Sequence, residues 1–88
     1  MSHRNVDWDA VASIRSSKSR RLVVESLQDS PKYAQEIADD LDYVNRDTAT
    51  RQIRWLKKRD LAECLTPDRP HHRIYGLTEE GEAVADEV

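Results

Sequence analysis

The chain has 88 residues, enough for one small domain and too few for a multidomain enzyme. Hydrophobic residues make up 38% and charged residues 35%, a mixture too apolar for a disordered chain and too charged for a membrane protein. No apolar run approaches the roughly 20 residues of a membrane span, and no signal peptide is evident. The single cysteine, Cys64, excludes a fold built on disulfides. We therefore expect a compact cytoplasmic domain.

The net charge of -3 hides blocks of opposite sign along the chain. Residues 45–75 hold eight Lys and Arg against four Asp and Glu, whereas residues 29–44 and 76–88 are strongly acidic. Within the basic block, six cations fall in fourteen residues: Arg46, Arg51, Arg54, Lys57, Lys58 and Arg59. This density is expected where a surface meets phosphate. The excess of Arg over Lys and of Asp over Glu favours a high-salt cytoplasm.

Two helices are predicted in the first third of the chain. Residues 7–16 place apolar side chains on one stripe, and this short helix needs a partner to pack on. Residues 18–27 form a second helix capped by Ser17. Its apolar side chains cover one face, so Arg20 and Arg21 are expected to point outward.

The middle of the chain predicts a short acidic helix followed by a basic one. Lys32 and Tyr33 can donate one or two ladder bonds to a later sheet before the helix at residues 34–41. An irregular segment, residues 42–44, then separates it from the basic helix at residues 45–58, which is capped by an Asn or Asp side chain.

The last third predicts a hairpin and a final helix. Residues 61–65 and 73–77 form two strands around a loop, residues 66–72, that two prolines stiffen. Thr78 caps the last helix. The expected fold class is therefore α+β, mainly α, and the order of elements is that of a winged helix-turn-helix, with one extra helix at the N-terminus and a lone ladder position before the third helix.

The basic helix is predicted to bury one side and present the other. At about 100° per residue, Ala49, Ile53 and Leu56 mark the buried side. The polar and basic side chains expected to meet DNA are Arg46, Thr48, Thr50, Arg51, Gln52, Arg54, Lys57 and Lys58. Arginine can fork onto guanine, threonine can bond to a base or phosphate, and Gln52 can read adenine if its flank faces the duplex. The lysines would contact only phosphates.

The alternative for this helix is a solvated basic face with no partner. The acidic segments on either side of it argue against that alternative, because they leave one positive surface on an otherwise negative chain.

Two sequence stretches resemble the helix-turn-helix of MarR- and ArsR-type regulators. They are YAQEIADDL at residues 33–41 and TATRQIRWLKKRDL at residues 48–61. The stretches ECLTP at residues 63–67 and RIYGLTEEG at residues 73–81 resemble the wing and final helix of archaeal, especially haloarchaeal, members. The resemblance runs from about Ser17 to the end. It implies a winged helix-turn-helix that binds double-stranded DNA and regulates transcription.

One position departs from the pattern of these regulators, which usually carry glycine just after the recognition helix. Here Asp60 occupies it. Because the chain adopts a left-handed turn there and aspartate tolerates that turn only moderately, we expect a small loss of stability and an unchanged fold.

The hairpin tip, residues 66–73, is predicted to reach the minor groove or its phosphates, as the wing does in the resembling proteins. Its candidate contacts are Arg69, His71, His72 and Arg73, with Arg69 the best suited to insertion. An ordinary polar tip is the alternative. A metal site joining His71 and His72 to His3 or Cys64 is disfavoured, because adjacent histidines project differently and Cys64 lies in an alternating strand.

The N-terminal helix, within residues 1–16, is expected either to cover the core of the domain at residues 17–88 or to pair across a two-fold axis. Trp55 lies off the apolar stripe of the basic helix, and core packing is its expected role. We favour a homodimer, because two recognition helices about 34 Å apart can read a palindrome. The candidate dimer contacts are Trp8, Val11, Val84 and Val88.

The sequence argues against an enzyme, because it lacks a nucleophile and base pair, a glycine-rich phosphate loop and a metal-ligand spacing. No cofactor, membrane contact or small-molecule effector is predicted. The main prediction is a DNA-binding transcriptional regulator, acting as a repressor by occlusion. The alternative is a winged-helix module whose basic face binds an acidic protein.

Overall fold

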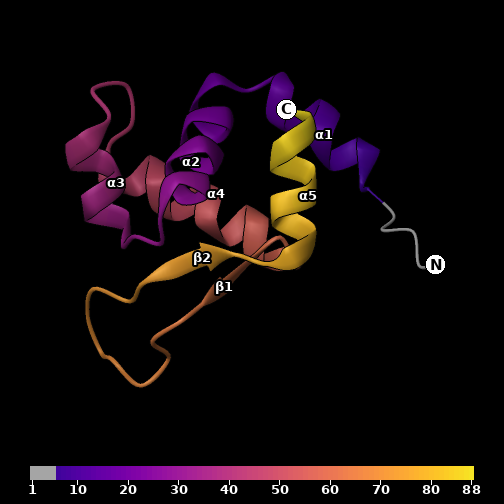
Figure 1. Ribbon diagram of the computed structural model, residues 1–88. Helices are drawn as coiled ribbons and strands as arrows, with labels where there is room; N and C mark the ends of the chain where they lie inside the picture. Colours follow the sequence, from indigo (N-terminus) through magenta and orange to yellow (C-terminus); the bar gives the residue numbers. More distant parts are fainter. Residues whose placement is uncertain (1–5) are drawn as a thin grey trace.

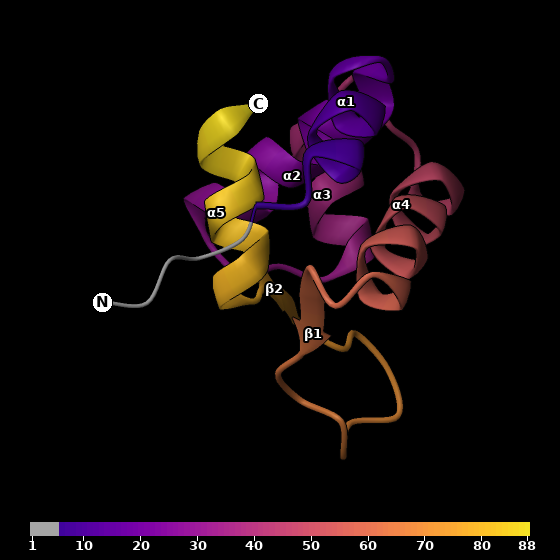
Figure 2. The same cartoon turned by 90° about the vertical axis from the view of Figure 1, so that its right-hand side faces the viewer.

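The computed structural model describes residues 6–88, and the helices and strands of this region follow the predicted order (Figure 1). They are α1 (Trp8–Arg15), α2 (Lys18–Asp29), α3 (Ala34–Asp40), α4 (Arg46–Lys58), β1 (Ala62–Cys64), β2 (Tyr75–Leu77) and α5 (Glu79–Glu87). The hairpin loop extends away from the helices (Figure 2). The predicted fold class, mainly α with a small antiparallel sheet, is confirmed. None of the helices in this part of the chain combines the length and apolarity needed to cross a bilayer.

Side-chain caps fix where most of the helices begin. In each case an oxygen accepts a hydrogen bond from the backbone amide three residues on, which satisfies a donor that the helix itself leaves unpaired. The capping residues of this kind are Asp7, Ser17, Asn45 and Thr78. Asn45 is therefore the residue that starts the basic helix, at 2.8 Å from Oδ1 to the Thr48 amide.

The two strands form an antiparallel ladder of three residues each, shorter than the predicted strands at residues 61–65 and 73–77. Ala62 pairs with Leu77 and Cys64 pairs with Tyr75, and the Leu65 amide donates to the Ile74 carbonyl just beyond the ladder. On the other edge, Lys32 and Tyr75 exchange both backbone hydrogen bonds, which confirms the predicted lone ladder position.

Each helix of the described region contributes at least one buried apolar side chain to a single core cluster. Fully burying a Val, Ile or Leu side chain stabilises a domain by about 1.5–3 kcal/mol. Helix α1 belongs to this cluster, so it packs on its own domain. Val11 and Val84 are each only 2% exposed. The prediction that these two valines contact a second subunit is therefore wrong, because the core of the same chain already covers them.

The turn after α4 connects this helix to β1 and contacts the start of α5. Asp60 has φ 61°, so the predicted left-handed conformation is confirmed. The Thr78 hydroxyl donates to the Asp60 carbonyl at 2.6 Å, and the Thr78 amide donates to the Leu61 carbonyl at 3.0 Å. A Cβ atom at Gly81 would lie 1.9 Å from that Leu61 oxygen. Only glycine lets the first turn of α5 approach this closely.

Candidate nucleic-acid interface

Helix α4 buries one side, as predicted, and presents its basic side to solvent. Ala49, Ile53 and Leu56 are at most 3% exposed. Arg51, Arg54 and Lys58 lie on the opposite, exposed side. Lys57 and Arg46 are also exposed, and Thr48 and Thr50 are half-buried at its flanks.

The outward arginines of α4 keep their charge free of internal partners. Within residues 6–88 the ion pairs are Lys32 with Asp29, at 3.6 Å, and Arg59 with Asp7, at 3.9 Å. Neither involves the outer face of α4. The acidic side chains of α3 therefore do not neutralise the outer face of α4, and that face can bind phosphate.

Gln52 does not belong to the outward face, and its predicted role as an adenine reader is wrong. The side chain is 6% exposed. Its Oε1 accepts from Arg20 Nε at 2.8 Å, and its Nε2 donates to Ser19 Oγ at 3.5 Å. The helical wheel already contained this signal, because Gln52 lies only about 60° from Ala49 and about 40° from Leu56, beside the buried stripe.

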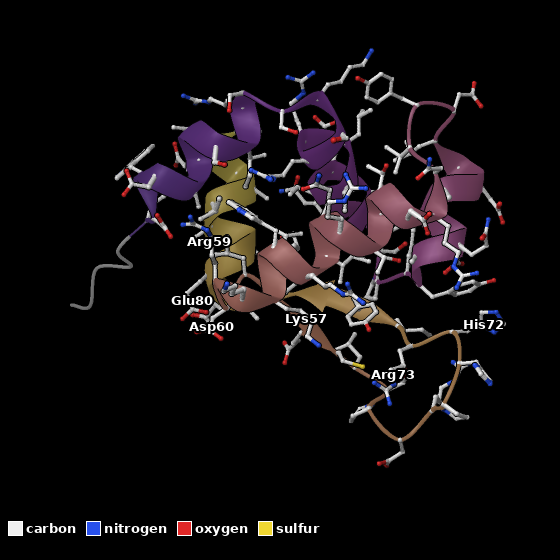
Figure 3. All side chains as sticks on the ribbon, turned by 180° about the vertical axis from the view of Figure 1, so that it is seen from behind. Lys57, Arg59, Asp60, His72, Arg73 and Glu80 are labelled. Carbon is white, nitrogen blue, oxygen red and sulfur yellow. The ribbon has the colours of Figure 1, made fainter. Side chains whose placement is uncertain are left out.

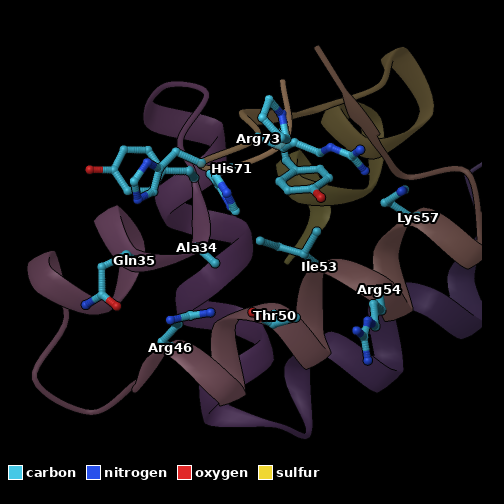
Figure 4. A pocket seen from close by; sticks show the side chains of 13 residues that line it. Ala34, Gln35, Arg46, Thr50, Ile53, Arg54, Lys57, His71 and Arg73 are labelled. Atoms are coloured by element: carbon cyan, nitrogen blue, oxygen red, sulfur yellow. The ribbon is translucent and has the colours of Figure 1, made fainter. Parts of the chain in front are cut away.

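A groove of about 940 Å³ lies between α4, the start of α3 and the hairpin loop (Figure 4). None of the residues that line it is acidic. Its cationic and polar side chains come from α4 and from the wing, and include Arg46, Thr50, Arg54, Lys57, His71 and Arg73. Figure 4 shows the α4 side chains on one side of the groove and His71 and Arg73 on the other. The fold thus brings part of each predicted contact set to one concave surface, whereas Thr48, Arg51, Lys58 and Arg69 do not line it.

The wing loop is held by its own hydrogen bonds. Arg73 Nε donates to the Arg69 carbonyl at 2.8 Å, and the Thr66 hydroxyl accepts from the Ile74 amide at 2.9 Å. His72 has φ 53°, a left-handed conformation that the sequence did not indicate, and its ring lies 4.8 Å from the Tyr33 ring. Arg69, His71, His72 and Arg73 are all exposed. The tip therefore presents four polar side chains in a defined shape.

On its other flank, α4 carries an aromatic and cationic network that the sequence did not predict. Trp55 is half-buried, and the guanidinium carbons of Arg20 and Arg59 lie 4.1 and 4.6 Å from its ring centroid. Arg20 also donates to Ser13 Oγ of α1 at 2.5 Å. The expectation that Arg20 points outward is therefore wrong. Burial, and next the charge of Arg59, hold the pKa of Arg20 below its ordinary value.

No group of three or more His, Cys, Asp or Glu suited to a metal ion occurs between residues 6 and 88. His3, a candidate partner of His71 and His72, lies outside the described residues.

The model of the HVO_A0261 N-terminal domain family matches residues 8–88. The chain belongs to this family. No curated protein matches the sequence.

Solved structures with the same fold include ZitR of Lactococcus lactis, the MarR family transcription regulator SP03579, and the reduced transcriptional regulator YodB of B. subtilis. The identities are 18%, 21% and 21%, and the TM-scores are 0.69, 0.72 and 0.73. The matches cover 81%, 91% and 96% of this chain, and 49%, 58% and 83% of those chains. The family member thus spans about half the length of ZitR and SP03579. SP03579 and YodB are transcription regulators.

Proposed function

We propose that this protein binds double-stranded DNA and regulates transcription, with α4 in the major groove and the wing at the minor groove or its phosphates. The observation that carries the proposal is the unneutralised basic face of α4, continuous with an acid-free groove and an exposed, basic wing tip. The fold shared with transcription regulators supports it.

The side chains divide by what they can contact. Arg51 and Arg54, on the outer face, are placed for base edges, where a guanidinium can fork onto guanine. Lys57 and Lys58 are placed for phosphates, and Thr48 and Thr50 for either. Gln52 takes no part in the contact, because its amide is already bonded inside the domain.

The protein groove between α4 and the wing lies where one DNA backbone would pass. The major and minor grooves of a duplex are separated by one sugar-phosphate backbone. If α4 occupies the first and the wing the second, that backbone passes between them. The cationic groove lies there, with Arg46, Lys57 and Arg73 toward it. Arg69 at the tip is then free to enter the minor groove, whose narrow form concentrates negative potential.

We further propose a cytoplasmic, archaeal homodimer that represses by occluding the promoter. A single unit of this size offers few base contacts, whereas two units on a palindrome double them.

The test is the salt dependence of binding to a random-sequence DNA duplex. Affinity of the wild-type chain is expected to fall with log salt by about 0.9 log units per neutralised phosphate. Lys57→Gln/Lys58→Gln is expected to reduce that slope by about 1.8, because two phosphate contacts are lost. Arg21→Gln is the control, because Arg21 lies on the same face of α2 as Gln28, whose amide bonds Asp86 of α5.

Failure of the wild-type chain to bind duplex at any salt would overturn the proposal and favour the acidic-protein partner. Equal slopes for the double variant and the Arg21→Gln control would remove Lys57 and Lys58 from the interface.

A further inference from the structure

Four cations around α4 lie over aromatic rings. Lys18 Nζ lies 4.4 Å from the Tyr43 centroid, and Lys57 Nζ lies 5.5 Å from the Tyr75 centroid. The Trp55 ring carries both Arg20 and Arg59. Lys57 belongs to the groove already described, but Lys18, Arg20 and Arg59 do not.

A ring fixes a cation without neutralising it. A carboxylate partner would cancel the charge that a phosphate needs, whereas the face of an aromatic ring attracts the cation and leaves its full charge in place. Among residues 6–88, neither Lys18 nor Arg20 has a carboxylate partner, and Arg59 has only the long contact to Asp7 at 3.9 Å. The three cations are therefore held in place, and Lys18 and Arg59 are also exposed.

Arg20 and Arg59 share the Trp55 ring on one flank of α4, and Lys18 lies over Tyr43, three residues before the helix begins. Arg20 bonds to Gln52 in the middle of α4, and Arg59 follows the last residue of the helix. Figure 3 shows that Lys57 and Arg73 lie on the hairpin side of α4, whereas Arg59 lies on the side of α1. Helix α4 thus has one cationic edge toward the wing and a second away from it.

A DNA duplex would contact both cationic edges of α4. A helix about 10–12 Å wide fills a major groove about 12 Å wide, and a sugar-phosphate backbone forms each wall of that groove. One wall meets the wing side of α4. The other wall must run along the opposite flank, where these cations lie.

We propose a second phosphate-contact cluster, which binds the far backbone of the same major groove. Its members are Lys18, which lies over the Tyr43 ring, and Arg20 and Arg59, which lie over the Trp55 ring. The proposal rests on the proposed function and names contacts that complete it. Bound phosphate also relieves the crowding of Arg20 and Arg59 on one ring, because it places a negative charge beside two positive ones.

The test compares Lys18→Gln/Arg59→Gln with Arg21→Gln on a random-sequence duplex. Both substituted cations are exposed, so folding is expected to persist, and circular dichroism and thermal melting check it. Loss of two phosphate contacts is expected to lower the salt slope by about 1.8 and affinity at 0.1 M salt by up to about 60-fold. Arg21→Gln, with half the change in charge, is expected to leave both values near wild type.

A second pair of variants tests Arg59 without removing it. Asp7→Asn keeps a residue that caps helices well and frees Arg59 from its ion pair, so duplex affinity is expected to rise. Asp9→Asn, on the same helix and with the same change in charge, is the control and is expected to have a smaller effect.

The outcomes separate the two proposals. A wild-type chain that binds no duplex overturns both. A wild-type chain that binds, with Lys18→Gln/Arg59→Gln matching Arg21→Gln in slope, overturns the second cluster alone. Asp7→Asn and Asp9→Asn with equal effects would remove Arg59 from it.

Discussion

Asp60 is strained by its position, and a single substitution is expected to relieve it. A left-handed conformation costs a residue other than glycine about 1–2 kcal/mol, and glycine loses part of that advantage through about 0.5–1 kcal/mol of unfolded-state entropy. Asp60→Gly is therefore expected to raise the free energy of unfolding by about 0.5–1 kcal/mol, measured by denaturant titration. The hydrogen bonds that tie this turn to Thr78 end on the backbone carbonyls of Asp60 and Leu61, and they survive the change.

Asp68→Gly is the control for that experiment, because Asp68 is an exposed loop residue without a positive φ. It is expected to be neutral or destabilising. A loss of stability in Asp60→Gly as well would mean that the Asp60 side chain stabilises the turn by an interaction other than its conformation.

The direction in which a side chain of the site points was predictable where it follows from the helical wheel alone. The outward Arg51, Arg54 and Lys58 are of this kind. The inward position of Arg20 and the identity of the partner of Gln52 are not, because their hydrogen bond joins residues that are 32 positions apart in the chain. Periodicity reports which side of a helix is apolar, but not which polar side chain from another helix will meet it there.

At the scale of elements, the position of α5 depends on one glycine. The Cβ atom of Gly81→Ala would lie 1.9 Å from the Leu61 carbonyl oxygen, a contact that only movement of the backbone relieves. Overpacking of this type costs about 1–3 kcal/mol, occasionally more. Gly81→Ala is therefore expected to destabilise the domain by at least this amount, measured by thermal or denaturant unfolding.

Gly76→Ala is the matched control. Its Cβ would meet the end of the Leu65 side chain at 3.1 Å, and Leu65 is 47% exposed, so that side chain can move. A small effect is expected. If the two variants unfolded alike, the close approach of α5 to the turn after α4 would not be what Gly81 provides.

The order and the starting points of the helices could be predicted from local signals in the sequence. Caps such as Ser17 and Thr78 and the spacing of apolar residues indicated where the helices begin. The strands were predicted two residues too long because alternation continues past the last ladder bond. The shape of the wing was not predictable, since it depends on the left-handed His72 and on its contact with Tyr33.

For the whole molecule, a net charge of -3 is compatible with a polyanionic partner because the charges are segregated. Figure 3 places Asp60 and Glu80 near the C-terminal end of α4, and His72 and Arg73 toward the tip of the wing. Screening in about 0.15 M salt acts over about 8 Å, so distant carboxylates have little effect on a phosphate at the basic face. The local field, and not the total charge, determines which surface a duplex meets.

The proposed homodimer places its contacts where α1 and α5 lie side by side. Arg15 donates to the Glu87 carbonyl there, which joins the ends of the two helices. Of the four residues first considered, Val11 and Val84 are buried, whereas Trp8 is 59% exposed and Val88 is only partly covered. A large exposed indole on a helix anchored to the core is suited to a subunit contact, because burying an aromatic side chain stabilises association strongly.

Sedimentation equilibrium is expected to show a dimer for the wild-type chain and a shift toward monomer for Trp8→Ser. The wild-type chain is expected to bind an inverted repeat with half-sites about 10 base pairs apart as two copies per duplex, because its recognition helices would then lie one helical turn apart. Leu65→Ser, which removes another exposed apolar side chain but from the hairpin, is the control and should remain dimeric. A monomeric wild-type chain that binds one half-site as tightly as the full repeat would show that each domain reads DNA alone.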